Sequence, residues 1–139
     1  MKYLLDTCMI SELIRPIPSA KVTGWIDSHE EQDFFLSVIT LGEIKKGISK
    51  LADGKKKMQL QSWLADELME RFNGRVLGVT TEVALLWGGI LGDSEKKGKT
   101  IPVVDALIAA TAITNGLTLV TRNTSDMTAS GAVLFDPWE

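Results

Sequence analysis

Short runs of apolar residues alternate along the chain with longer stretches in which apolar residues recur every three or four positions. The short runs predict strands, and they lie at residues 3–5, 34–38, 76–79, 118–121 and 132–135. The longer stretches predict helices, and they lie at residues 9–15, 19–28, 40–51, 57–72, 81–91 and 103–114. Strands that are apolar throughout and alternate with helices favour a parallel sheet covered on both faces. We therefore expect an α/β fold.

Local signals predict where several of these helices begin and end. Thr40 and Glu43 have the spacing of a capping box, which predicts that the third helix begins at Thr40. Gly74 is expected to end the fourth helix, and Thr81 to cap the next one. Pro102 suits the first turn of the Ala-rich helix that follows it.

The composition is that of one intracellular domain. The chain of 139 residues is 45% hydrophobic and 24% charged, which is enough apolar material for one packed core, and no linker or repeat divides it. We therefore treat residues 1–139 as one domain. The single cysteine, Cys8, cannot close an internal disulfide, and no apolar stretch approaches the length of about 20 residues needed to span a membrane. We expect a soluble, cytoplasmic protein.

The net charge of −3 gives no general attraction to nucleic acid, but the lysines are clustered. Six of them lie between positions 45 and 57 against one acid, Asp53, and three more lie between 96 and 99. Such clusters are usually solvated helix ends. Because each one borders a carboxylate discussed below, an electrostatic role stays open.

Polar side chains follow the predicted strands. Asp6 ends the first strand, and Asn123 and Asp126 follow the fourth. Glu43 and Asp105 lie in the first turns of predicted helices. Taken singly, each of these residues is typical of a turn, a cap or a helix N-terminus. Because ligands of open parallel sheets sit beyond the carboxyl ends of the strands, we expect the four segments to bring these side chains to one edge.

Several carboxylates at one edge repel one another and need a compensating charge. Ligands that are all oxygen, with no second cysteine and no histidine pair, favour Mg²⁺ or Mn²⁺ over zinc. Hard-ion sites of this kind usually act on phosphate esters, where the metal activates a water and neutralises charge on the phosphate. The pattern therefore predicts a metal-dependent site for phosphate esters.

Other chemistries fit the same residues less well. A metal-free acid pair, as in glycosidases, stays open, although 6% aromatic residues are few for a sugar platform. A nucleophilic Cys8 would need the only histidine, His29, which lies in a different connection, so Cys8 is expected in the core. Phosphatases with an aspartyl nucleophile commonly have a second Asp where this chain has Cys8. Receiver domains need an Asp and a Lys where it has Ser37 and Arg122.

Four motifs resemble those of the PIN-domain family. They are LLDT at 4–7 followed by ISE at 10–12, Ser37 and Thr40 ahead of Glu43, GKTIPVVDALIAAT at 98–111, and TRNTSD at 121–126. Their order and spacing cover nearly the whole chain, and the ending FDPW resembles that of toxins of the VapC and FitB type. The resemblance implies a three-layer α/β/α sandwich, Mg²⁺-dependent endoribonuclease activity, a homodimer and inhibition by a small cognate antitoxin.

The resemblance also implies roles for single residues. The family's invariant acidic positions fall on Asp6, Glu43 and Asp105, and its fourth acidic position is Asn123 here, with Asp126 three residues later. Asp6 and Asp105 are expected to hold the metal, with Glu43 as a further ligand or the general base. Asn123, Asp126 or both are expected to hold the water at the metal.

Residues around the acids are expected to support them. Thr7, Ser11 and Thr121 are candidates for hydrogen bonds to the metal ligands, although short hydroxyl residues near turns are more often caps. RNA fits better than duplex DNA, because a narrow acidic pocket admits a single-stranded loop more readily than a stiff duplex. The residues expected to guide the RNA backbone are Lys45, Lys46 and Arg122.

Two hypotheses of different classes follow. In the first, the chain is a toxin that cleaves structured or single-stranded RNA, tRNA included. In the second, it is a regulatory module with little nuclease activity, a corepressor that reaches operator DNA only through a DNA-binding antitoxin. In both, an antitoxin segment is expected along apolar surface around Trp25, Ile26, Leu41 and Ile48, with an Arg directed at the acidic site.

Overall fold

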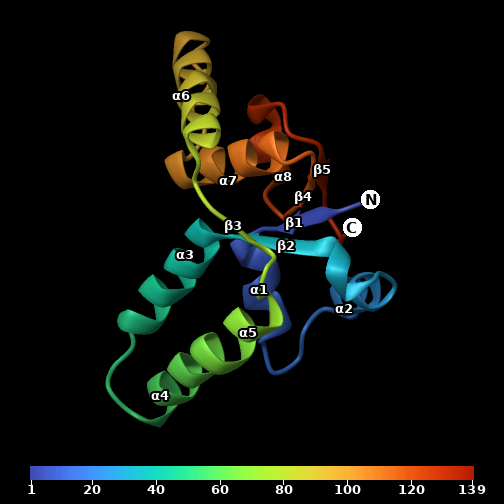
Figure 1. Ribbon diagram of the computed structural model, residues 1–139, viewed down its shortest axis with the longest axis vertical. Coiled ribbons are helices and arrows are strands. Elements are labelled where there is room, and N and C mark those ends of the chain that lie inside the picture. Colours follow the sequence, from blue (N-terminus) through green and yellow to red (C-terminus); the bar gives the residue numbers. More distant parts are fainter.

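The computed structural model describes residues 1–139 and contains five short strands in one sheet, in the order β3-β2-β1-β4-β5 (Figure 1). All four strand pairings are parallel, which confirms the predicted α/β fold. The strands are β1 (Tyr3–Leu5), β2 (Phe34–Ser37), β3 (Val76–Leu77), β4 (Thr118–Val120) and β5 (Leu134–Phe135).

Helices lie in all four connections between the strands, and each predicted helix is present. The α-helices are α1 (Thr7–Leu13), α2 (Ala20–Asp27), α3 (Val38–Ser49), α4 (Lys55–Ser62), α5 (Met69–Arg71), α6 (Thr81–Lys96), α7 (Val103–Thr114) and α8 (Thr124–Met127). Two 3₁₀ turns, η1 (Glu31–Asp33) and η3 (Thr128–Ser130), precede β2 and β5. A π-helical stretch, η2 (Trp63–Leu68), joins α4 to α5, so the helix predicted at 57–72 is one rod from 55 to 71.

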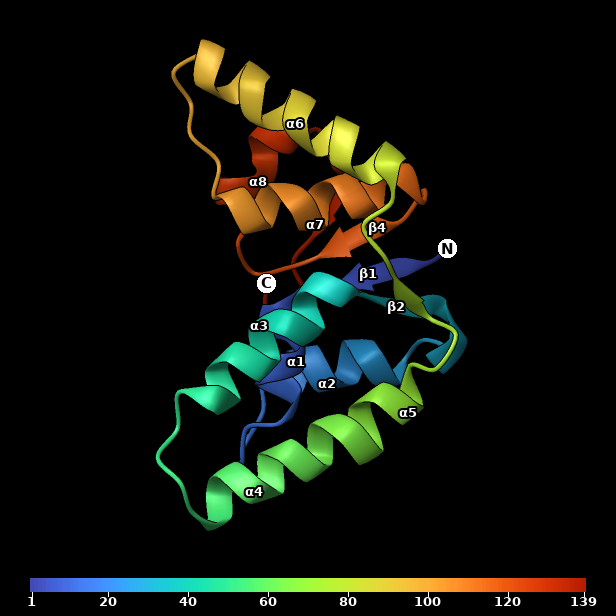
Figure 2. The same cartoon turned by 60° about the vertical axis from the view of Figure 1, so that its left-hand side comes forward.

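The sheet separates two layers of helices (Figure 2). Tyr3 and Leu5 of β1 pack with α1, α2, α3 and η2, whereas Leu4 between them packs with α7. This alternation follows from the period of two in a strand, because successive side chains point to opposite faces. Small residues of α7, such as Ala106 and Ala110, then let α6 pack closely on its outer side. The result is the three-layer sandwich that the family resemblance implied.

The predicted start of the third helix was wrong. Ser37 caps α3, since its hydroxyl accepts a 3.1 Å hydrogen bond from the backbone N–H of Ile39, and Thr40 is buried inside the helix. β2 pairs with β3 as far as Ser37 opposite Leu77, so the helix starts directly where the pairing ends. Glu43 is therefore in the second turn of α3 and has no capping role.

Three further boundaries test the local signals. Gly74 has φ of +81°, a left-handed conformation that follows the end of the helical rod, as predicted. Thr80, and not Thr81, caps α6 by accepting a hydrogen bond from the N–H of Val83. The segment after β4, expected as a loop, contains α8. None of the helices is both long enough and apolar enough to cross a membrane.

Candidate active site

Asp6 lies at the carboxyl end of the central strand and caps α1. Its Oδ1 accepts a 2.8 Å hydrogen bond from the backbone N–H of Thr7, and its Oδ2 accepts one of 2.8 Å from the hydroxyl of Thr121. The residue is 3% exposed and makes no ion pair. Hydrogen bonds and the N-terminus of α1 therefore hold this carboxylate without a cation.

Thr121 connects Asp6 to the loop after β4. Besides donating to Asp6, its buried hydroxyl accepts a 3.0 Å hydrogen bond from the backbone N–H of Asn123. Asn123 is the residue before α8, and Asp126 lies in the first turn of that helix; both are exposed. The structure thus brings the Asn123 segment to Asp6, as the parallel sheet predicted.

A side chain of α1, Thr7, hydrogen-bonds to Glu43 of α3. The hydroxyl of Thr7 donates a 2.5 Å hydrogen bond to Oε1 of Glu43, and it lies 3.2 Å from the hydroxyl of Thr40. Thr40 has no exposed surface, so its hydroxyl is committed to this contact between α1 and α3. Of these two supporting residues, Thr7 was expected from the sequence, and Thr40 was misassigned to a helix cap.

The pKa of Asp105 shows that the four acids interact electrostatically. Asp105 lies in the first turn of α7 and is half-buried. Burial and, next, the negative charges of Asp6, Glu43 and Asp126 together raise the pKa of Asp105 to about 6. None of these four carboxylates forms an ion pair with a lysine or arginine. Four segments therefore deliver unneutralised negative charge to one edge of the sheet.

The donor set fits a hard divalent cation. It consists of carboxylate oxygens with no thiolate or imidazole, which is the set that Mg²⁺ and Mn²⁺ prefer. As the side chains lie, no three of them converge closely enough to form a closed metal cage. Like charges repel one another, and a cation bound among these side chains would draw them together.

Cys8 lies in the site and not in the apolar core where it was expected. Its Sγ is 3.7 Å from Oδ2 of Asp6 and 3.7 Å from the hydroxyl of Thr121. Burial, and next the charge of Asp6, raise the pKa of the thiol to about 11. Cys8 is therefore protonated at neutral pH in the metal-free protein, and a protonated thiol is a poor nucleophile. His29 hydrogen-bonds Tyr3, at the opposite end of β1.

The remaining predicted residues border the acids. Ser11 is exposed on α1 and makes no hydrogen bond to the carboxylates. Lys45 and Lys46 are exposed on α3, beyond Glu43. Arg122 is exposed, and its guanidinium stacks 5.4 Å from the centre of the Trp138 ring. The cationic side chains thus flank the acids without neutralising them.

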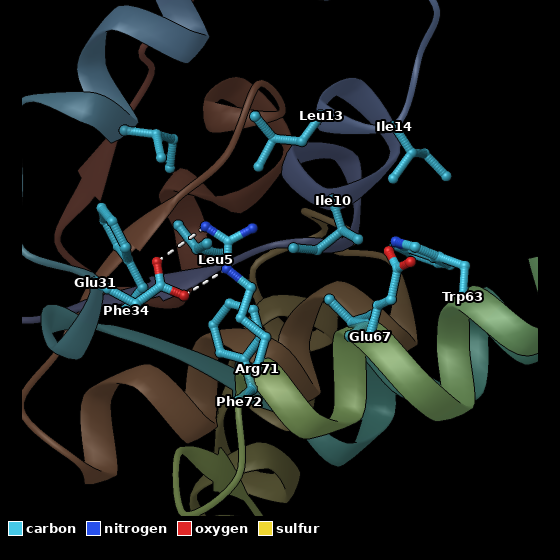
Figure 3. Close-up of a pocket in the computed structure, with 12 residues that line it drawn as sticks. Leu5, Ile10, Leu13, Ile14, Glu31, Phe34, Trp63, Glu67, Arg71 and Phe72 are labelled. Carbon is cyan, nitrogen blue, oxygen red and sulfur yellow. Dashed lines mark hydrogen bonds and ion pairs between the residues drawn. The ribbon is translucent and has the colours of Figure 1, made fainter.

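An apolar groove of about 250 Å³ begins at the acids and runs between α1, α3 and the α4–η2 rod. Thr7 and Glu43 line it, together with apolar side chains. The apolar residues that line it are Ile10, Ile14, Ile44, Ile48, Leu51, Leu60 and Trp63. Trp63 and Ile14 also line a second, largely apolar cavity of about 190 Å³, where Arg71 pairs with Glu31 (Figure 3).

The apolar surface predicted around Trp25, Ile26, Leu41 and Ile48 is largely used by the core. Ile48 is 4% exposed, and the other three pack against the same core cluster. The ring of Trp25 meets that of Tyr3 edge-on at 4.9 Å. The accessible apolar surface next to the acids is instead the groove beside α1.

Comparison with known proteins agrees with this architecture. Residues 3–127 match the model of the PIN domain. The chain is 39% identical over 135 residues to Toxin FitB of Neisseria gonorrhoeae, covering 97% of each protein. It is 34% identical over 136 residues to VapC ribonuclease Y4jK of Sinorhizobium fredii, covering 98% of this chain and 97% of the relative. A chain in the crystal structure of FitAcB from Neisseria gonorrhoeae superposes with a TM-score of 0.93 at 39% identity, covering 99% of both. The family resemblance is thus confirmed, and the chain belongs to the PIN-domain family, among its FitB- and VapC-type members.

Proposed function

We propose that this protein is a divalent-metal-dependent endoribonuclease and the toxin of a toxin–antitoxin pair. The observation that carries the proposal is the group of four carboxylates without cationic partners, Asp6, Glu43, Asp105 and Asp126, whose charges reach one another at the sheet edge. Relatives named as VapC ribonucleases support the same activity.

Asp6 and Asp105 would hold Mg²⁺ or Mn²⁺, with Glu43 as a further ligand or the general base, and the metal when bound neutralises charge on the phosphate and acidifies a water. Thr121 and the N–H of Thr7 each hold one oxygen of Asp6, which fixes the carboxylate before any ligand arrives.

Glu43 is the candidate general base. The hydroxyl of Thr7 occupies Oε1 of Glu43, so Oε2 is left to take a proton from the attacking water. The water oxygen then bonds to phosphorus while the bond to the leaving ribose oxygen breaks, and that oxygen takes up a proton from solvent. Asn123 and Asp126, on the loop held by Thr121, would orient that water.

RNA is the proposed substrate class, and a single-stranded segment suits the narrow acidic edge. Lys45, Lys46 and Arg122 are exposed beside that edge and would contact phosphates on either side of the cleaved bond. We propose tRNA among the candidate substrates, because its loops present unpaired nucleotides.

An antitoxin is the proposed protein partner, supported by the structural relatives, which are toxin–antitoxin complexes. The apolar groove that begins at Thr7 and Glu43 suits one side of an amphipathic segment. An Arg of that segment would pair with the carboxylates at the end of the groove, because its planar fork binds two oxygens at once. A homodimer, and operator binding through the antitoxin, complete the proposed assembly.

The test is a turnover assay on structured RNA with the antitoxin removed. We expect cleavage with Mg²⁺ or Mn²⁺, loss of cleavage with a chelator, and loss of cleavage in Asp105→Asn protein at unchanged circular dichroism. If the cleavage rate is unchanged both by the chelator and by Asp105→Asn, the metal-site proposal is overturned. Absence of cleavage together with tight operator binding by the antitoxin complex would favour the corepressor function instead.

A further inference from the structure

Helices α3 and α4 form a hairpin (Figure 2). It carries six lysines, of which Lys45 and Lys46 were placed beside the cleavage site above and the other four follow them along the hairpin. Five of them are exposed and form no ion pair. These hairpin lysines are Lys45, Lys46, Lys50, Lys55 and Lys56.

The sixth lysine of the hairpin, Lys57, differs from the other five because it has a structural role. The Nζ of Lys57 contacts the carbonyl oxygens of Ser49 and Leu51 at 3.4 and 3.3 Å and Oδ1 of Asp53 at 3.3 Å. Lys57 therefore ties the loop to the end of α3. It also occupies Asp53, the only acid between positions 45 and 57, so none of the hairpin lysines pairs with an acid of the loop.

Two of the hairpin lysines occupy positions that are unfavourable for folding. Lys55 and Lys56 lie in the first turn of α4, which contains no acidic residue, and the N-cap, Gly54, has no side chain to accept a hydrogen bond. The helix dipole places partial positive charge at this end, so cations there destabilise the helix. Cations at a helix N-terminus without a compensating contact indicate that these lysines serve function and not folding.

The hairpin lysines are also aligned with the acidic site. Lys46 and Lys50 follow Glu43 by three and seven residues, which places them on the same side of α3. At 1.5 Å per residue, Lys50 is about 10 Å along the helix from Glu43. Lys56 lines the groove in which Glu43 and Thr7 lie. Positive charge thus extends from the acids outward to the tip of the hairpin.

We propose that the hairpin lysines bind the phosphate backbone of a single-stranded RNA segment outside the cleaved bond. This inference rests on the proposed ribonuclease function and adds a second contact region for the same substrate. Flexible lysines without defined partners suit a run of phosphates. A protein partner is disfavoured because four of the five hairpin lysines lie outside the groove assigned to the antitoxin, and lysine is depleted in protein interfaces.

The test measures RNA binding without cleavage, in the full chain with Asp105→Asn. Fluorescent single-stranded RNAs of about 6 and about 16 nucleotides bracket the length range of single-strand binding sites. In this background we expect Lys55→Glu to weaken binding of the longer RNA at least about fivefold at 0.1 M salt, since one phosphate contact adds about 0.7 to the salt slope. Lys55→Glu/Lys56→Glu lowers that slope by about 1.4, and binding of the short RNA changes little.

Lys21→Glu is the matched control. Lys21 is an exposed lysine in the first turn of α2, which has eight residues like α4. Both single reversals change the net charge equally, and both raise the melting temperature by placing an acid at a helix N-terminus. Only Lys55→Glu is expected to weaken RNA binding, which separates a binding surface from a general charge effect.

Three results would overturn the proposal: equal loss of RNA affinity in both variants, no loss in either, or loss of antitoxin binding alone in Lys55→Glu protein. The parent chain is assayed for cleavage in parallel. If it binds RNA through the hairpin lysines but does not cleave it with metal, the proposed function fails and the surface stands. If the parent chain cleaves RNA and RNA affinity does not depend on the hairpin lysines, only the proposed binding surface is refuted.

Discussion

The hydroxyl of Thr121 donates a 2.8 Å hydrogen bond to Oδ2 of Asp6, across 115 positions of sequence. The register of β1 and β4 explains the contact, because Leu5 lies opposite Val120 and the next residue of each strand is therefore a neighbour. The same hydroxyl holds the N–H of Asn123. A single buried side chain thus fixes the orientation of Asp6 and the position of the loop that follows β4.

Removing this hydroxyl should harm both stability and activity. Thr121→Val keeps the shape of the side chain and leaves the buried Oδ2 of Asp6 without its main donor, at a cost of about 1–3 kcal/mol in unfolding free energy. We expect RNA cleavage to fall strongly and Thr121→Ser to restore most of it. Chemical denaturation and a cleavage assay measure the two effects. A Val variant with parent-like stability and turnover would contradict the assigned role of the bond.

Thr40 is expected to position Glu43 through Thr7. Thr40→Val removes the hydroxyl that lies 3.2 Å from that of Thr7, so Glu43 is held less firmly. We expect slower cleavage and a higher Mg²⁺ midpoint, with rescue by Thr40→Ser. Thr111→Val is the control, because that buried threonine donates to the carbonyl of Leu107 at 2.9 Å, within α7. Equal metal midpoints in the two Val variants would remove the positioning role.

The Asp105 carboxyl should make a contribution to the stability of the metal-free protein that is lost as the pH rises from about 4 to about 6, and the comparison with Asp105→Asn protein isolates this contribution. The pKa of Asp105 is raised from 3.8 to about 6, so over this interval the folded state binds more protons than the unfolded state. The contribution of Asp105 is therefore greatest below the lower value and falls through the interval, by about 1–2 kcal/mol once solvent screening of this half-exposed group is allowed for.

Asp105→Asn should abolish this pH dependence and raise the melting temperature of the metal-free protein at pH 7, while abolishing cleavage. Melting curves across the pH range, with a chelator present, measure the first two effects. Added Mg²⁺ should stabilise the parent more than the variant. The same pH dependence of stability in the parent and in Asp105→Asn protein would refute the raised pKa of Asp105.

Asp126 should contribute more to the metal site than Asn123. Its charge is one of those that raise the pKa of Asp105, so Asp126→Asn removes negative charge from the site, whereas Asn123→Ala removes none. We therefore expect Asp126→Asn to raise the Mg²⁺ midpoint of cleavage more than Asn123→Ala does. The opposite ranking would transfer the role to Asn123.

Antitoxin binding should depend on Glu43 and on salt. An Arg at the end of the groove would lose part of its charge pairing in Glu43→Gln protein, which should weaken binding and flatten its salt dependence. Glu70→Gln is the control, because Glu70 is an exposed acid outside the groove. If Asp6→Ala/Glu43→Ala protein binds the antitoxin as tightly as the parent at low and high salt, inhibition does not run through the acids.

The sequence determined the elements and their order by itself. Apolar runs and helical spacing predicted the five strands and the main helices, because burial imposes these periods on any sequence that forms such layers. The carboxyl ends of parallel strands share one edge of the sheet, so the sequence predicted that Asp6 and Asn123 lie near each other. In the structure, the hydroxyl of Thr121 bonds to both of these residues.

Only the tertiary structure decided what each polar residue does. Ser37 and Thr40 are both acceptable helix caps locally, and the pairing of β2 with β3 through Ser37 selected the first and turned Thr40 toward Thr7. The position of Cys8 beside Asp6, and the raised pKa of Asp105, likewise depend on segments far away in the chain. Caps, hydrogen bonds and charges act over a few ångströms, and the folded packing, not the local sequence, sets which groups meet at that range.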